Sequence, residues 1–140
     1  MKYIITLIIL TFTLLLAACG TQTPSEPVQA EDVDLANLPA NVDVNTTAAL
    51  LDDPDVVLID VREPSEYSEG HIPGITLIPM GEVLSRLDEI PHDKTVIVSC
   101  RSGNRSSQVT DFLRENGYDN VHNMSGGIVA WQQAGLEVEK

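Results

Sequence analysis

A cysteine opens the polar stretch SCRSGNRSS at residues 99–107, and its thiolate could act as a nucleophile. Gly103 permits the backbone angles of a tight turn, so successive N–H groups can point inward and form a nest for an anion. A helix expected to begin near Ser106 adds the positive end of its dipole at the same place. The stretch therefore predicts that Cys100 is a catalytic nucleophile whose anionic form, or anionic ligand, is held by backbone N–H groups.

The spacing within this loop bears on the size of its ligand. Tyrosine-type phosphatases share a Cys-x5-Arg loop, whose arginine clamps a tetrahedral phosphate with two hydrogen bonds. Counted from Cys100, that position falls on Ser106, and the arginine stands one place earlier, at Arg105. The shorter loop predicts a smaller cradle, which suits a single sulfur atom better than a phosphate. A phosphatase or an arsenate reductase on a related fold remains an alternative that this count disfavours.

The second cysteine lies at the end of an apolar leader. Lys2 is the only charge in residues 1–18, which are otherwise largely apolar and end in Leu-Ala-Ala directly before Cys19. This pattern is typical of a secretory signal peptide, and its ending resembles the bacterial lipobox. We expect residues 1–18 to be a lipoprotein signal peptide and Cys19 to carry the lipid. The alternative is an uncleaved anchor, although the apolar run is shorter than the roughly 20 residues of a spanning helix.

A lipid on Cys19 would leave Cys100 without an intramolecular partner. The expected location is extracytoplasmic, with the protein anchored to a bacterial membrane by its lipid; the sequence does not say which membrane. Unpaired thiols are prone to oxidation outside the cytoplasm. A lone cysteine there is therefore explained better by reactivity than by packing.

The chain beyond residue 18 is strongly acidic. Of the eight basic residues only Lys2 lies in the leader, so seven remain against 21 acidic ones, a net charge of −14. Such a surface argues against nucleic acid as a partner. Residues 19–41 contain three prolines, four acidic residues and no basic one, which predicts a disordered tether. Residues 42–140 are then expected to form one domain.

Two hydrophobic periodicities alternate along that domain. β-branched runs predict strands, and spacings of three and four residues predict helices. The expected class is α/β, with a small, mainly parallel sheet flanked by helices. Strands are expected at 56–59, 75–78 and 95–99, with weaker ones at 42–44 and 120–122; helices are expected at 46–51, 82–87, 106–116 and 127–134. Cys100 then follows the carboxyl end of a strand, where parallel sheets bind ligands.

Four motifs in order resemble those of the rhodanese family, in its single-domain thiosulfate sulfurtransferase form, over residues 42–138. They are LIDVRE at 58–63, EYSEGHIPG at 66–74, CRSGNRS at 100–106, and NMSGG at 123–127 followed by Trp131. The resemblance implies a rhodanese-like fold. It also implies that Cys100 takes a sulfane sulfur from a donor such as thiosulfate and passes the sulfur, through a persulfide, to cyanide or a thiol. The alternative is a sulfur carrier or protein-interaction module without turnover of its own.

The loop residues after Cys100 receive their expected roles from the same resemblance. The backbone N–H groups of this set are expected to surround the transferred sulfur: Arg101, Ser102, Gly103, Asn104 and Arg105. The two arginines are expected to attract an anionic donor, and Arg105 has ordering of the loop as its alternative role. The histidines show no ligand spacing and no nucleotide-binding motif is present, so we expect neither a metal nor another cofactor.

Polar residues after the strand at 56–59 form a second group of candidates. Asp60 and Arg62 could line the pocket, but an ion pair of structural importance with Glu66 or Glu69 is the favoured expectation. His71 lies in a Gly-His-Ile-Pro-Gly turn, which we expect it to orient by hydrogen bonds.

Overall fold

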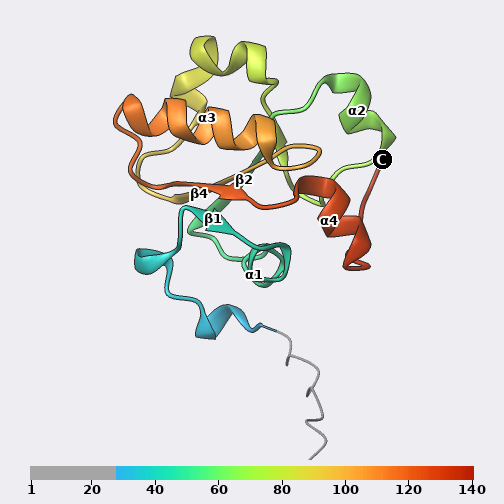
Figure 1. The fold of residues 1–140 in the computed structure, drawn as a ribbon. Coiled ribbons are helices and arrows are strands. Elements are labelled where there is room, and N and C mark those ends of the chain that lie inside the picture. Colours follow the sequence, from blue (N-terminus) through green and yellow to red (C-terminus); the bar gives the residue numbers. More distant parts are fainter. Residues whose placement is uncertain (1–27) are drawn as a thin grey trace, which may run out of the picture.

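The computed structural model describes residues 28–140, which form a parallel sheet between two layers of helices (Figure 1). Every pairing in this sheet is parallel, and the strand order is β1-β5-β4-β2-β3. The strands are β1 (Asn41–Val42), β2 (Val56–Asp60), β3 (Thr76–Leu77), β4 (Thr95–Ser99) and β5 (Val121–Met124). The predicted α/β class with a small parallel sheet is confirmed.

The helices divide between the two faces of the sheet. They are α1 (Val44–Ala49), α2 (Pro64–Glu69), α3 (Asn104–Glu115) and α4 (Gly127–Gln133), with the 3-10 helix η4 at Met80–Glu89. Figure 1 shows α3 and the yellow η4 on one side of the sheet, and α1 and α4 on the other. Each face therefore has its own hydrophobic core.

The central strand β4 supplies both cores. Val96 and Val98 pack into the core under α3 and η4, whereas Ile97 packs on the opposite face with Trp131 of α4. Successive side chains of a strand point to opposite faces, so a strand covered on both sides must be apolar throughout. This explains the continuous β-branched run of β4. The packing on both faces holds β4 in place, and Cys100 follows directly at its carboxyl end.

Two elements differ from the predicted ones. The segment predicted as a helix at 82–87 is a 3-10 helix, Met80–Glu89, interrupted at Arg86, whose φ of −125° is not helical. The sequence reading also missed α2, whose start carries a capping box between Glu63 and Glu66 with Pro64 in the first turn. Both signals are typical of a helix start.

The predicted tether is corrected in its second half. Two 3-10 helices, η2 (Ala30–Asp32) and η3 (Leu35–Asn37), precede β1. The side chains of Val33, Leu35 and Leu38 pack against the core on the α1 face. This acidic, proline-containing segment therefore folds onto the domain because it carries enough apolar side chains to bury.

The predictions for residues 1–18 and for Cys19 lie outside the described residues. Within residues 28–140, none of the helices combines the length and the hydrophobicity that crossing a membrane requires.

Candidate active site at the end of strand β4

Cys100 follows directly on β4 and is buried, with 1% of its surface exposed. Gly103 adopts the left-handed conformation, with φ of 94°, and stands immediately before the first residue of α3. The turn is therefore tighter than predicted, because Asn104 and Arg105 already belong to the first turn of the helix. A short turn of this kind brings several backbone N–H groups to one atom.

Hydrogen-bond donors converge on the Cys100 sulfur. The Gly103 N–H donates to Sγ at 3.1 Å, and the Ser106 hydroxyl lies 3.3 Å from Sγ. Burial raises the pKa of the Cys100 thiol, but the Ser106 hydroxyl and the backbone N–H groups of Ser106, Ser102 and Gly103 lower it by more. The net effect is a Cys100 pKa below its ordinary value, so the site favours an anionic sulfur.

The start of α4 contacts the backbone of the cysteine loop. The N–H groups of Ile128 and Val129, at the start of α4, donate to the carbonyls of Cys100 and Arg101 at 2.9 and 3.1 Å. Gly127 lies beneath this contact with φ of +57°, and a Cβ added there would stand 2.3 Å from the Cys100 carbonyl oxygen. Only glycine fits such an approach without displacing the loop. The motif at residues 123–127 therefore serves to seat the cysteine loop.

Two further residues of the site were not predicted. The hydroxyl of Ser106 lies 2.6 Å from Oδ1 of Asn123 on β5, and Asn123 in turn donates from Nδ2 to Oδ1 of Asn41 on β1. Ser106 is fully buried and Asn123 is 6% exposed. In the sequence, Ser106 marks the end of the loop and the expected start of a helix, and Asn123 is part of a motif; neither position predicts a side-chain contact with the other. Their contact depends on the packing of α3 against β5, which spacing along the chain does not reveal.

Arg105 pairs with a carboxylate far away in the sequence. Its two terminal nitrogens donate to both oxygens of Glu66, each at 2.7 Å, across a separation of 39 residues. The hydrogen bonds from Arg105 are the main cause that lowers the pKa of the Glu66 carboxyl to about 2. Such a bidentate pair ties α2 to α3. Ordering of the site, the alternative role expected for Arg105, is the one that this geometry supports.

Replacing Glu66 with glutamine should make this pair measurable through pH. A depressed folded-state pKa stabilises the protein above the unfolded value near 4.5, and this stability is lost as the pH falls from there towards about 2. Both side chains remain partly exposed, so solvent screening reduces the contribution to about 1 kcal/mol. Urea unfolding at pH 7 should show that loss in the Glu66→Gln variant, and the difference from the parent protein should vanish near pH 2. A difference that stays constant across this range would contradict the role of the pair.

Asp60 and Arg62 form an ion pair with each other. Arg62 Nη2 lies 2.7 Å from Asp60 Oδ2, and both side chains are almost fully buried. Arg62 also donates to the backbone carbonyls of Glu66 and Gly70, at 3.1 and 2.9 Å. The expected pairing with the carboxylate of Glu66 or Glu69 is thus wrong, because the adjacent Asp60 takes the guanidinium and the backbone of α2 takes its remaining N–H groups. Arg62 joins the end of β2 to α2.

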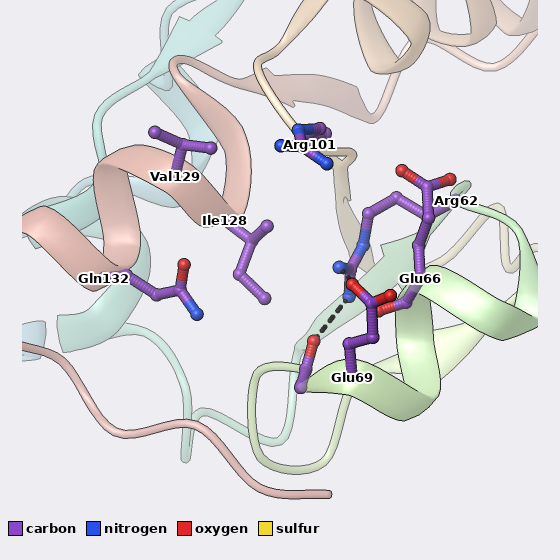
Figure 2. Close-up of a pocket in the computed structure, with 8 residues that line it drawn as sticks. Arg62, Glu66, Glu69, Arg101, Ile128, Val129 and Gln132 are labelled. Atoms are coloured by element: carbon purple, nitrogen blue, oxygen red, sulfur yellow. Dashed lines mark hydrogen bonds between the residues drawn. The ribbon is translucent and has the colours of Figure 1, made fainter.

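A pocket of about 250 Å³ opens beside the loop, between α2 and α4 (Figure 2). Its lining residues are Arg62, Glu66, Glu69, Gly70, Arg101, Ile128, Val129 and Gln132. Figure 2 shows Arg101 and the α2 residues around one side, with Ile128, Val129 and Gln132 of α4 opposite. The exposed Arg101 makes no ion pair with any residue of the described chain, so its charge is available to a ligand.

His71 is held within its turn by three contacts. Its Nδ1 lies 3.1 Å from the carbonyl of Tyr67, its ring stacks on that of Tyr67, and its Nε2 lies 3.4 Å from Glu139. These contacts orient the turn. Among residues 28–140, no cluster of three His, Cys, Asp or Glu side chains could hold a metal ion.

Known proteins share both the sequence and the fold of this chain. A sulfurtransferase of Allochromatium vinosum is 44% identical over 89 residues, 64% of this chain and 83% of that protein. The thiosulfate sulfurtransferase GlpE of Pseudoalteromonas translucida is 34% identical over 94 residues, 67% of this chain and 90% of that protein. The crystal structure of a rhodanese-related protein from Thermoplasma volcanium superposes with a TM-score of 0.67 at 29% identity, covering 72% of this chain and 98% of that one. The family model of the rhodanese-like domain matches residues 43–134, and the chain therefore belongs to the rhodanese-like domain family.

Proposed function

We propose that this protein is a sulfurtransferase that takes sulfane sulfur from thiosulfate and transfers it to cyanide or to a thiol. The Cys100 thiolate attacks the outer sulfur of thiosulfate; the S–S bond breaks, sulfite leaves with the electron pair, and a Cys100 persulfide remains. Cyanide then attacks the outer sulfur of the persulfide, which yields thiocyanate and regenerates the Cys100 thiolate. The observation that carries this proposal is the set of donors around Cys100 Sγ.

The donors serve the reaction by stabilising negative charge on sulfur. The backbone N–H groups of Ser102, Gly103 and Ser106 are fixed by the turn and by α3 before any substrate arrives. Fixed dipoles that need no rearrangement stabilise a developing charge more effectively than water does. The thiolate and the persulfide anion both benefit, whereas a neutral thiol does not.

The pocket supports a small, anionic donor. Its volume of about 250 Å³ lies below the range typical of sites for drug-sized ligands. Two charged residues of the pocket lining already have partners, since Arg62 pairs with Asp60 and Glu66 pairs with Arg105. Arg101 also lines the pocket and makes no ion pair within residues 28–140, so it can attract thiosulfate into the site.

Mass spectrometry of the full chain in detergent tests the proposal. After incubation with thiosulfate, the peptide that contains Cys100 should gain one sulfur atom, and cyanide should remove it with release of one equivalent of thiocyanate. No gain from thiosulfate, with sulfur acquired only from a persulfide-bearing protein, would instead support the carrier role. No gain from either source would exclude both.

We also propose, from the leader sequence, that Cys19 carries a lipid and anchors the domain to a bacterial membrane outside the cytoplasm. Radiolabelled fatty acid should then appear in the parent protein and be absent from a Cys19→Ala variant. Label retained in that variant would contradict the proposal.

A further inference from the structure

The Ser106 hydroxyl has two neighbours and only one proton to give. It lies 3.3 Å from Cys100 Sγ and 2.6 Å from Asn123 Oδ1, and it is fully buried. A thiolate accepts hydrogen bonds and donates none, and an amide oxygen also only accepts. When Cys100 is anionic, Ser106 therefore cannot satisfy both neighbours as they stand.

The arrangement seen in the structure fits a neutral thiol. At 3.3 Å the contact can run in either direction: an anionic sulfur accepts from the Ser106 hydroxyl, whereas a neutral Cys100 S–H can donate to Ser106 Oγ and leave the Ser106 proton for Asn123 Oδ1. Asn123 Nδ2 completes the chain by donating to Asn41 Oδ1 at 2.8 Å. Each acceptor in this series then accepts one hydrogen bond, and the donors point from the sulfur outward to β1.

An anionic sulfur requires the opposite direction. If the Ser106 hydroxyl turns to Sγ, its oxygen faces Asn123 Oδ1 at 2.6 Å with no proton between them, which is repulsive. Rotating the Asn123 amide by half a turn brings Nδ2 towards Ser106 and Oδ1 towards Asn41. The amide oxygen and nitrogen are nearly equal in size, so this rotation needs no repacking. No proton passes between residues, since only the orientations change.

Asn41 is placed to follow this reversal. It lies on β1 at the edge of the sheet, where its side chain is exposed. Its amide can turn towards solvent and present Nδ2 to Asn123 at little cost, whereas a buried amide would lose a partner on turning.

We propose that Asn123 and Asn41 are positioning residues, which reverse their amides when Cys100 becomes anionic and so free the Ser106 hydroxyl to donate to the sulfur. The reversal around a Cys100 persulfide rests on the proposed function. The reversal around a Cys100 thiolate does not, because the thiolate forms without any sulfur donor. A test on the resting protein therefore succeeds or fails independently of thiosulfate turnover.

We call the hydrogen-bonded series Cys100, Ser106, Asn123 and Asn41 the relay. Replacing the exposed Asn41 with aspartate tests whether the relay reverses. A carboxylate only accepts, so it holds Asn123 Nδ2 outward and keeps the Ser106 proton on Asn123. The pKa of Cys100 should rise by about one unit in Asn41→Asp, a tenfold fall in the fraction of thiolate at a pH below that pKa. In the matched Asn41→Ala variant neither amide orientation is held, and the pKa should stay within a few tenths of a unit of the parent value. Thiolate absorbance of the full chain, titrated with pH and corrected with the matching Cys100→Ser form, gives both values.

A Ser106→Ala variant distinguishes an effect through the relay from the direct effect of the negative charge that aspartate adds. The charged groups around the sulfur are Arg101 in the loop, Arg105 on α3 with its partner Glu66, and the Asp60 pair at the end of β2; none of them is altered.

In a Ser106→Ala background, Asn41→Asp should no longer shift the Cys100 pKa. An equal shift in both backgrounds, or no shift in the parent background, would overturn the proposal. If the Ser106→Ala protein fails to fold, salt provides the same separation. At about 1 M salt, where the Debye length is roughly 3 Å, a through-space effect of the exposed aspartate should weaken, whereas a relay effect should keep its size.

Discussion

Replacing Cys100 with serine should lower the rate of thiocyanate formation from thiosulfate and cyanide by at least about a thousandfold. The serine oxygen is smaller than sulfur but can still accept from the Gly103 N–H, so the loop should keep its form. A serine hydroxyl in this ring stays protonated at neutral pH, however, and oxygen cannot carry the transferred sulfur as a persulfide. The loss should therefore be chemical and leave the fold intact.

Steady-state assays of the full chain in detergent, with the released thiocyanate measured, check this expectation. The matched control is Cys19→Ala, which removes the other cysteine of the chain and should keep full turnover. The thermal unfolding midpoint of the Cys100→Ser variant should lie close to that of the parent. Substantial turnover in the Cys100→Ser variant would exclude the proposed nucleophile.

Gly127→Ala should damage the site through the backbone alone. The new Cβ would stand 2.3 Å from the Cys100 carbonyl oxygen and 2.6 Å from the Arg101 carbonyl carbon, and both atoms are backbone that cannot simply swing away. The left-handed φ of +57° adds further strain for a residue with a side chain. We expect the free energy of unfolding to fall by about 3 kcal/mol, and sulfur transfer to fall about a hundredfold as the loop is displaced.

Gly117 provides a close control for this prediction. It also has a positive φ, +90°, but no atom lies within 4 Å of a Cβ added there. Gly117→Ala should therefore cost only the conformational strain, about 1 to 2 kcal/mol, with turnover unchanged once the protein is folded. Equal losses of turnover in the two variants would show that the close approach at Gly127 is unimportant.

Much of the fold could be predicted because local sequence determines it. The run at β4 is β-branched on both faces, and only a covered parallel strand needs that composition. The place of Cys100 follows from the strand before it and the glycine after it. The helix α2 was not predicted, although Pro64 in its first turn and the capping box between Glu63 and Glu66 are local signals of a helix start.

Other features depend on contacts across the chain. Nothing near Arg105 in the sequence indicates that Glu66 is its partner, since the pair joins two helices across 39 residues. The same holds for Ser106 and Asn123, which come from a helix and from a neighbouring strand. The 3-10 form of η4 also escaped prediction, because the apolar spacing that predicts an α-helix does not specify the hydrogen-bond pattern.

The backbone of the loop is held by one set of contacts, and different groups, its exposed side chains, are free to contact ligands. Its backbone is fixed by N–H groups of α4 and by the approach to Gly127, while the side chains of Arg101, Ser102 and Asn104 are exposed and make no hydrogen bond within residues 28–140. Random libraries at these three positions can therefore explore new donors and acceptors while the sulfur cradle stays in place. The loop is in this sense an evolvable module, in which substrate range can diverge among descendants without a penalty to folding.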